Sequence, residues 1–167
     1  MFGKPPGKEA DLKETPVDEQ VPTEDGGYQK YKAAGKLEGK KAIITGGDSG
    51  IGRAVAILFA MEGADSFIAY LQEEEEDAQE TKRRVEAHGR KCYLMATDIR
   101  SKDNCKKVVD EALSKMGGIN ILINNAATQM TTNSILDLPE EQWENTFQTN
   151  IHRKSKPRTQ KLQAIKS

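Results

Sequence analysis

Residues 41–52, KAIITGGDSGIG, have the spacing in this chain that is best suited to ligand chemistry. A short apolar run ends at Thr45, and glycines follow at Gly46, Gly50 and Gly52, where an apolar-periodic segment begins. Glycine permits a tight turn and a close approach of the backbone to a ligand. A helix that starts directly after such a turn offers unpaired N–H groups and a positive dipole end to a phosphate. The pattern indicates a dinucleotide pyrophosphate site, although glycines alone also fit a turn without a ligand.

The elements that would position this turn alternate along the chain. Apolar runs predict strands, and apolar residues at helical spacing, with acidic starts and basic ends, predict helices. The expected strands are 41–45, 66–70, 91–96 and 119–123, and the expected helices are 50–61, 73–88, 102–116 and 137–151. Such alternation predicts an α/β fold with a parallel sheet covered on both faces.

Two motifs resemble the short-chain dehydrogenase/reductase family. The segment TGGDSGIG at 45–52 is similar to the family's cofactor loop, and NNAA at 124–127 is similar to its Asn-Asn-Ala-Gly segment, with Ala127 in place of glycine. The resemblance covers roughly residues 36–151. It implies a Rossmann-type three-layer αβα domain with strand order 3-2-1-4, in which the family's C-terminal strands are missing.

The resemblance also implies a set of cofactor contacts. The family places its glycine loop on the pyrophosphate, an aspartate after the third strand on the adenine, and the segment after the fourth strand at the sheet edge and the adenosine ribose. An aspartate that only caps a helix is the alternative for the second of these roles. The corresponding residues are Gly46, Ser49, Gly50, Ile51 and Gly52, then Asp98, then Asn124 and Ala126.

The choice between NAD and NADP rests on the end of the second strand. An acidic residue there would bind the ribose 2′-hydroxyl of NAD, but the strand ends Ala69-Tyr70-Leu71, with no acid before Glu73. Arg53 is a candidate for contact with a 2′-phosphate, whereas Ser49 is not the basic residue found in many NADP-binding relatives. The balance favours NADP slightly.

Catalysis in the family uses Asn, Ser, Tyr and Lys, with Tyr-x-x-x-Lys as the marker. Asn150 in Thr149-Asn150-Ile151 matches the family's Asn, and no tyrosine follows it in the sequence. Tyr28 and Lys32 have the right spacing, but they precede the first strand, so we interpret that match as chance. Asn150 is therefore expected to be the one remnant of the catalytic tetrad.

The two ends of the chain differ from the middle. Residues 1–36 are polar and proline-rich, which favours a disordered arm; an arm lying on a neighbouring subunit and a stress-related tail are the alternatives. Similar extensions occur in the glucose/ribitol dehydrogenase-like and general-stress-protein-like subgroup. Residues 37–151 are expected to form the partial NAD(P)-binding domain. Residues 152–167 are basic and leave the family pattern, as a truncation, a frameshift or a sequencing error would produce; an RNA-binding tail is the weaker alternative.

Composition narrows the class of protein. A net charge of −1 over 167 residues gives no global attraction to nucleic acid or to a membrane surface. No apolar run approaches the roughly 20 residues of a membrane span. Cys92 and Cys105 lie in patterns typical of buried thiols, which favours a reduced, cytoplasmic protein. The acidic run 73–77 is interpreted as a solvated helix start, so no metal site is expected.

Two functional hypotheses follow. The first is the cofactor-binding half of an NAD(P)-dependent oxidoreductase that interconverts alcohols and carbonyls, inactive as these 167 residues; the second is a non-catalytic dinucleotide-binding or interaction module. A downstream reading frame that encodes Tyr-x-x-x-Lys would favour the first. A small alcohol or carbonyl substrate is expected only in a full-length relative. The family is homo-oligomeric, and the exposed strand edge at 119–123 predicts that this chain self-associates.

Overall fold

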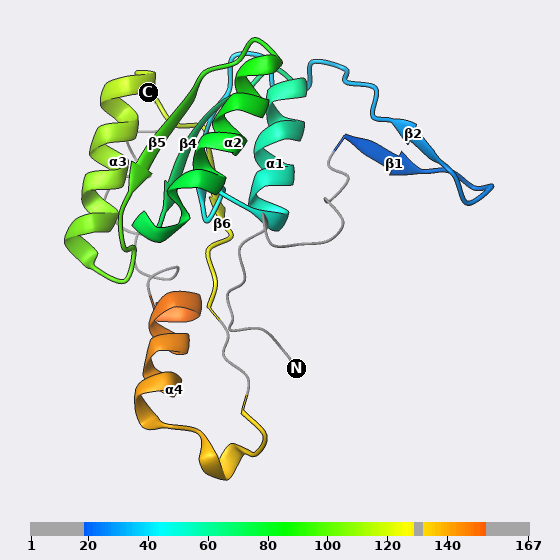
Figure 1. The fold of residues 1–167 in the computed structure, drawn as a ribbon. Helices are drawn as coiled ribbons and strands as arrows, with labels where there is room; N and C mark the ends of the chain where they lie inside the picture. The colour runs from blue at the N-terminus through cyan, green and yellow to red at the C-terminus, as the bar shows by residue number, and fades with distance from the viewer. Residues whose placement is uncertain (1–18, 129–131, 153–167) are drawn as a thin grey trace.

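The computed structural model describes residues 19–128 and 132–152 of the chain. Its centre is a four-stranded parallel sheet in the order β5-β4-β3-β6 (Figure 1). The strands are β3 (Lys41–Thr45), β4 (Asp65–Tyr70), β5 (Cys92–Ala96) and β6 (Ile121–Asn124). This order is the expected 3-2-1-4, so the predicted partial Rossmann-type sheet is confirmed.

Helices cover the two faces of the sheet unequally. The helices α1 (Gly50–Met61) and α2 (Glu75–Ala87) pack on one face, and α3 (Lys102–Met116) packs on the other. β3 separates the two cores because successive strand side chains point to opposite faces: Ala42 and Ile44 lie in the first core, and Ile43 lies in the second. The chain therefore forms the three layers that the sequence predicts.

Helix ends follow the local sequence. The Ser101 hydroxyl accepts a hydrogen bond from the Asn104 N–H and caps α3, as predicted. Gly63, just past α1, and Gly117, just past α3, have φ angles of 98° and 72°. These left-handed conformations suit glycine, and they turn the chain back toward the sheet.

The segment before the sheet is described from Glu19 onward. The strands β1 (Gln20–Pro22) and β2 (Tyr28–Lys30) form an antiparallel hairpin, which projects from the side of the domain in Figure 1. Hydrogen bonds to the end of α1 take the place of the apolar packing that residues 19–36 lack. The disorder expected for residues 1–36 stays a prediction. Residues 1–18 lie outside the described residues.

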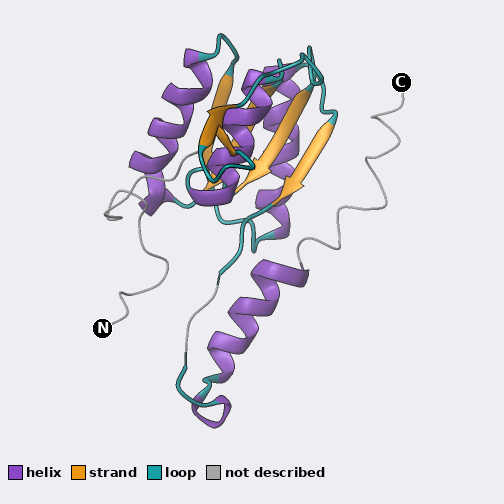
Figure 2. Cartoon of the chain, turned by 90° about the vertical axis from the view of Figure 1, so that its right-hand side faces the viewer, coloured by secondary structure: helices purple, strands orange, loops and turns teal. Residues whose placement is uncertain are grey.

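The segment after the sheet packs less closely on the domain than the sequence predicts. The predicted helix 137–151 is a short 3₁₀ turn, η3 (Ile135–Asp137), then α4 (Glu140–Phe147) and a π-helical turn, η4 (Gln148–His152). Trp143, Phe147 and Ile151 were expected to share a buried face, but Trp143 is 50% exposed and α4 has no buried residue. The expectation is wrong because α4 stands away from the sheet (Figure 2).

β6 is an edge strand in the described sheet, and only one of its faces is covered. Ile121 and Ile123 pack against the core beneath α1. Leu122 is paired with Ile43 and points toward the α3 side, where it is 48% exposed. The expected cover on both faces of this strand is therefore missing. Among the described helices, none is both long and apolar enough to pass through a membrane.

Candidate functional site

The glycine turn lies where β3 ends and α1 begins, at the carboxyl edge of the sheet. Gly46 has a φ of 63° and donates its N–H to the Ala69 carbonyl at 2.8 Å, which holds the turn against β4. A Cβ at Gly46 would lie 2.9 Å from the Ala126 Cα. The turn therefore fits only because glycine occupies this position.

Gly52 is packed still more closely. A Cβ there would overlap the Gly46 carbonyl oxygen and lie 2.6 Å from Nδ2 of Asn125. Neither a backbone oxygen nor an amide held by hydrogen bonds can move aside cheaply. Gly52 therefore serves the close packing of α1 against the turn.

Gly50 is different, because its surroundings are open. It has a φ of 50°, and a Cβ at this position would meet nothing within 4 Å. The next residue, Ile51, is 78% exposed, although the other apolar residues of α1 are all buried or partly buried. The open side of the turn is the space in which a phosphate could approach the start of α1.

Two residues that sequence reasoning did not select hold the turn to β6. The Asn125 amide donates to the Gly46 carbonyl at 2.7 Å and to the Thr45 carbonyl at 3.2 Å. The Thr45 hydroxyl accepts the N–H groups of Asn125 and Ala126. The second Asn of NNAA could have indicated this role, since an amide side chain directly after a strand can donate hydrogen bonds to the end of the adjacent strand.

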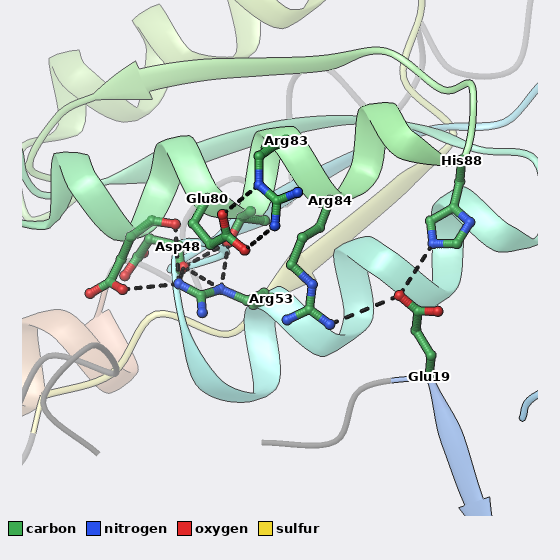
Figure 3. A network of polar contacts seen from close by, with 9 residues as sticks. Glu19, Asp48, Arg53, Glu80, Arg83, Arg84 and His88 are labelled. Atoms are coloured by element: carbon green, nitrogen blue, oxygen red, sulfur yellow. Dashed lines mark hydrogen bonds and ion pairs between the residues drawn. The ribbon is translucent and has the colours of Figure 1, made fainter. Parts of the chain in front are cut away.

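Arg53 does not have the position that contact with a 2′-phosphate requires. Its side chain is 5% exposed and points between α1 and α2 (Figure 3). Its Nη2 lies 3.0 Å from Oδ1 of Asp77 and donates to the Asp48 carbonyl at 2.7 Å. The expectation that Arg53 reaches the cofactor is therefore wrong, because a buried carboxylate and the turn itself engage its guanidinium.

Asp48 and Ser49 form the outer part of the turn. The Ser49 hydroxyl donates to the Asp48 carboxyl at 3.1 Å, while Ser49 also occupies the N-cap position of α1. Burial raises the pKa of the Asp48 carboxyl above its ordinary value. Ser49, Gly50 and Ile51 thus lie together at the head of α1, as the sequence predicts.

Asp98 lies just beyond β5 and is engaged by Arg100. The Arg100 guanidinium donates to both oxygens of the Asp98 carboxylate, at 3.0 and 2.9 Å from Nε, and the Arg100 N–H donates to Oδ1. These hydrogen bonds hold the pKa of the Asp98 carboxyl below its ordinary value. The carboxylate is ionised and partly exposed, and each oxygen can accept more than one hydrogen bond, so it can still accept one from an adenine amino group.

The end of β4 carries a tyrosine that is paired with an acid. The Tyr70 hydroxyl donates to the Glu75 carboxylate at 2.6 Å, and burial together with this bond raises the pKa of Tyr70. The strand itself ends without an acidic residue, since Tyr70 and Leu71 stand at its end. Glu75 reaches this edge from the first turn of α2, which the residue order along the strand does not reveal.

Asn150 lies in the π-helical turn η4, and both atoms of its amide are in use. Oδ1 accepts the Thr128 N–H at 2.9 Å, and Nδ2 donates to the Thr128 carbonyl at 2.9 Å. This double contact ties the end of α4 to the loop after β6. Single π-helical turns are frequent at functional sites, but here the amide has a positional task.

The predicted site residues gather at one edge of the sheet. The glycine turn follows β3, Asp98 follows β5, and Asn124 and Ala126 end or follow β6, with Asn124 exposed. In open parallel sheets, ligands bind at this carboxyl edge. Within residues 19–128 and 132–152, no group of three or more His, Cys, Asp or Glu side chains could hold a metal ion.

Comparison with known proteins assigns this architecture. The family model described as short chain dehydrogenase matches residues 40–154. The chain belongs to the short-chain dehydrogenase family. General stress protein 39 of Bacillus subtilis is 47% identical over 147 residues, which make up 88% of this chain and 48% of that protein. The glucose and ribitol dehydrogenase homolog of Oryza sativa is 48% identical over 74% of this chain and 43% of its own length.

Solved structures of short-chain dehydrogenases agree with this assignment. An enzyme from Burkholderia cenocepacia in complex with NADP has a TM-score of 0.66 and 34% identity, over 71% of this chain and 47% of that one. A second, from Mycobacterium paratuberculosis and bound to NAD, has a TM-score of 0.64 and 32% identity, over 70% and 46%. The chain thus spans about half the length of the short-chain dehydrogenases it matches. A nicotinamide dinucleotide is the ligand class of this family, and both dinucleotides occur among its structural neighbours.

Proposed function

We propose that the carboxyl edge of the sheet binds a nicotinamide dinucleotide, with the pyrophosphate on the open side of the glycine turn. The observation that carries this proposal is the contrast between Gly52, where no Cβ fits, and Gly50, where the space is empty. A turn packed tightly on the inside and open on the outside leaves room for a phosphate beside the first N–H groups of α1. Asp98 would accept from the adenine, and Asn124 and Ala126 would lie near the ribose.

A glycine pair tests this proposal. Gly50→Val should lower the affinity for NAD(H) and NADP(H) at least about tenfold, because the branched side chain would occupy the phosphate space. The substitution also strains a left-handed residue, at about 1–2 kcal/mol. Gly89→Val is the matched control. Gly89 also has a positive φ, 74°, and open surroundings, but it follows α2 at the end of that helix away from the proposed site.

Calorimetry on the purified chain separates the two effects. Both variants should lose a similar amount of stability, and only Gly50→Val should lose binding. Equal affinity of the wild type and Gly50→Val would overturn the assignment of the turn. Equal losses of affinity in both variants would show that strain, and not occupation of the site, is responsible.

For the choice between the two dinucleotides, we propose NADP on a narrower basis than the sequence suggested. Arg53 no longer supports it, because its guanidinium is buried against Asp77. The remaining support is that β4 ends in Tyr70 and Leu71, without an acid of its own to bind a ribose 2′-hydroxyl. Glu75 lies close by and would repel a 2′-phosphate. Titration with NADP and NAD in parallel decides: tighter binding of NAD would assign that acidic task to Glu75.

We further propose that the site serves an oxidoreductase that interconverts an alcohol and a carbonyl. The support is family membership, with Asn150 in the position of the family's catalytic Asn. No Tyr-x-x-x-Lys follows Asn150 in the sequence, and these two side chains supply the proton transfer in the family. A polypeptide of these 167 residues should therefore not turn over sugar alcohols or simple ketones. Turnover at 340 nm that is lost on Asn150→Ala would contradict this.

Cellular location and assembly are proposals of the same kind. A cytoplasmic location accords with Cys92 and Cys105, which are both free thiols. Homo-oligomer formation accords with family membership and with the exposed edge at β6. Sedimentation of the purified chain tests the second of these proposals.

A further inference from the structure

The carbonyl of Asp48 is the most heavily engaged group in the glycine turn. It accepts three hydrogen bonds: from Nε of Arg53 at 3.0 Å, from Nη2 of Arg53 at 2.7 Å and from the Thr81 hydroxyl at 2.7 Å. A carbonyl oxygen has two lone pairs, so three donors fix its direction closely. Thr81 belongs to α2, far from the turn in sequence, and it is fully buried.

The direction of this carbonyl determines the direction of the next amide. The Asp48–Ser49 peptide is planar, and in a trans peptide the N–H points opposite to the carbonyl. Donors on the inner side therefore hold the Ser49 N–H toward the outer side of the turn, where the phosphate is expected. Residues that never touch a dinucleotide would thus orient an amide that does.

Asp77 keeps Arg53 in this position. Its Oδ1 lies 3.0 Å from Nη2 of Arg53, and its main-chain carbonyl accepts the same nitrogen at 3.1 Å. Its other carboxylate oxygen is buried without a hydrogen-bond partner among the described residues. Burying an ion pair is costly in desolvation, and apolar residues of similar volume often stabilise a fold as well. A pair retained at this place is better explained by the position it imposes than by the stability it adds.

We propose that Arg53, Asp77 and Thr81 form a positioning group, which we term the α2 brace, that orients the Asp48–Ser49 peptide and thereby sets the affinity of the turn for a pyrophosphate. Figure 3 shows Arg53 in the space between α1 and α2, directed toward Asp48. The inference rests on the proposed dinucleotide site. It adds that the brace extends the site to Asp77 and Thr81 of α2, two buried residues that do not touch the ligand themselves.

Substitutions at Thr81 test the brace with little change in volume. Thr81→Val keeps the shape but removes the hydroxyl, which donates to the Asp48 carbonyl and accepts from Nε of Arg53 at 2.8 Å. Thr81→Ser keeps this hydroxyl and removes a methyl group. Thr81→Val should weaken binding of ADP-ribose at least about threefold, as expected for the loss of the two hydrogen bonds that the Thr81 hydroxyl makes, one to the Asp48 carbonyl and one from Nε of Arg53. Thr81→Ser should retain the wild-type affinity. Thr146→Val is the matched control, because the Thr146 hydroxyl also donates to a main-chain carbonyl, that of Gln142 at 2.8 Å, but in α4.

Amide hydrogen exchange supplies a reading that needs no ligand. Thr81→Val should speed exchange in residues 47–50 about three- to tenfold and leave the strands unchanged, and Thr81→Ser should not. If the wild type binds no dinucleotide, the proposed function is wrong, and the exchange data still decide on the brace. Unchanged exchange in Thr81→Val would overturn the brace. So would equal affinity losses in the Val and Ser variants, because a merely structural role follows stability and not the hydroxyl.

Discussion

The segments before and after the sheet are held to it in opposite ways. Residues 19–39 are polar, yet they are tied to the end of α1: the Tyr31 hydroxyl and the N–H groups of Ala34 and Lys36 all donate to the Glu62 carboxylate. Residues 132–152 carry large apolar side chains, yet α4 stands away from the sheet (Figure 2). The described hydrogen bonds that link this segment to the rest of the domain are that from Arg100 to Asn145 at 3.2 Å and the two between Asn150 and Thr128 at 2.9 Å.

The difference shows what each kind of sequence needs. The first segment is held by hydrogen bonds to a few groups at the end of α1, and these groups belong to the same chain. Glu62 is buried at the end of α1, and its main-chain carbonyl also accepts the Leu37 N–H. Glu19 adds contacts to α2, at 3.5 Å from His88 and 3.9 Å from Arg84 (Figure 3). The second segment needs apolar area as a partner, and the described residues do not provide it.

The largest expected contrast is between Phe67 in β4 and Trp143 in α4. Phe67 is fully buried, so Phe67→Ala should lower the free energy of unfolding by about 3–5 kcal/mol. Trp143 is half exposed and lies outside both cores, so Trp143→Ala should cost less than about 1 kcal/mol. Denaturation followed by circular dichroism measures both. Tryptophan fluorescence would not serve, because Trp143 is the one tryptophan of the chain and the variant lacks it.

A large loss in Trp143→Ala would contradict the comparison. It would mean that α4 packs on the sheet in solution, or on a second copy of the chain. Repeating the measurement at two protein concentrations separates these outcomes, because only association makes stability depend on concentration.

The second contrast concerns Glu62. Glu62→Ala removes the shared acceptor of three donors, so amide exchange at Ala34 and Lys36 should rise at least about tenfold, while exchange in β3 stays unchanged. Glu38→Ala is the control, because Glu38 is exposed and its side chain contacts Arg90 at 3.5 Å. If Glu62→Ala leaves exchange at these amides slow, the segment is held by something other than the carboxylate.

The sequence predicted the sheet and the turn because their signals are local. A short apolar run, three glycines and a periodic segment lie within residues 41–61, and Ser101 and Gly117 mark the ends of their own helix. These signals depend on neighbours along the chain, so no partner had to be guessed. The strand order came from the family resemblance and is confirmed.

The rest depended on partners far apart in sequence. Arg53 looked available for a phosphate because Asp77 lies 24 residues away on another helix. The spacing of Trp143 and Phe147 gave α4 an apolar stripe, but periodicity shows which face is apolar and not what covers it. The hairpin was not predicted because the segment is held by polar contacts to residues distant in sequence, such as Glu62, and not by an apolar pattern.

The third prediction uses the pKa of Glu62. The hydrogen bond from the Tyr31 hydroxyl, followed by that from the Lys36 N–H, holds the pKa of the Glu62 carboxyl below its ordinary value. A lowered pKa stabilises the folded form above the unfolded value of about 4.3, and this contribution is lost as the pH falls through the folded value. The segment before the sheet should therefore loosen below about pH 4.

Tyr31→Phe should move that loosening to higher pH, because the carboxylate loses its strongest donor. A carboxyl-carbon NMR titration of Glu62 in the wild type and the variant measures the shift directly. Tyr28→Phe serves as the control, since Tyr28 is exposed in the hairpin. Identical titrations of Glu62 in all three proteins would show that Tyr31 does not determine its pKa.

The smallest expected effect concerns the exposed apolar side chains of β6 and of the segment after the sheet. Leu122 on β6 is an apolar side chain on an edge strand, close in sequence to the exposed Ile135 and Leu136. Such an edge is a template for pairing with another chain, and a charge on it opposes that pairing. We expect the chain to self-associate at micromolar concentration and Leu122→Lys to weaken the association at least about threefold in sedimentation. Tyr28→Lys, an exposed site in the well-anchored hairpin, should leave it unchanged. A wild type that sediments as a sharp monomer and melts cooperatively would contradict this prediction, because it would mean that the edge and the apolar stripe of α4 are already covered within one chain.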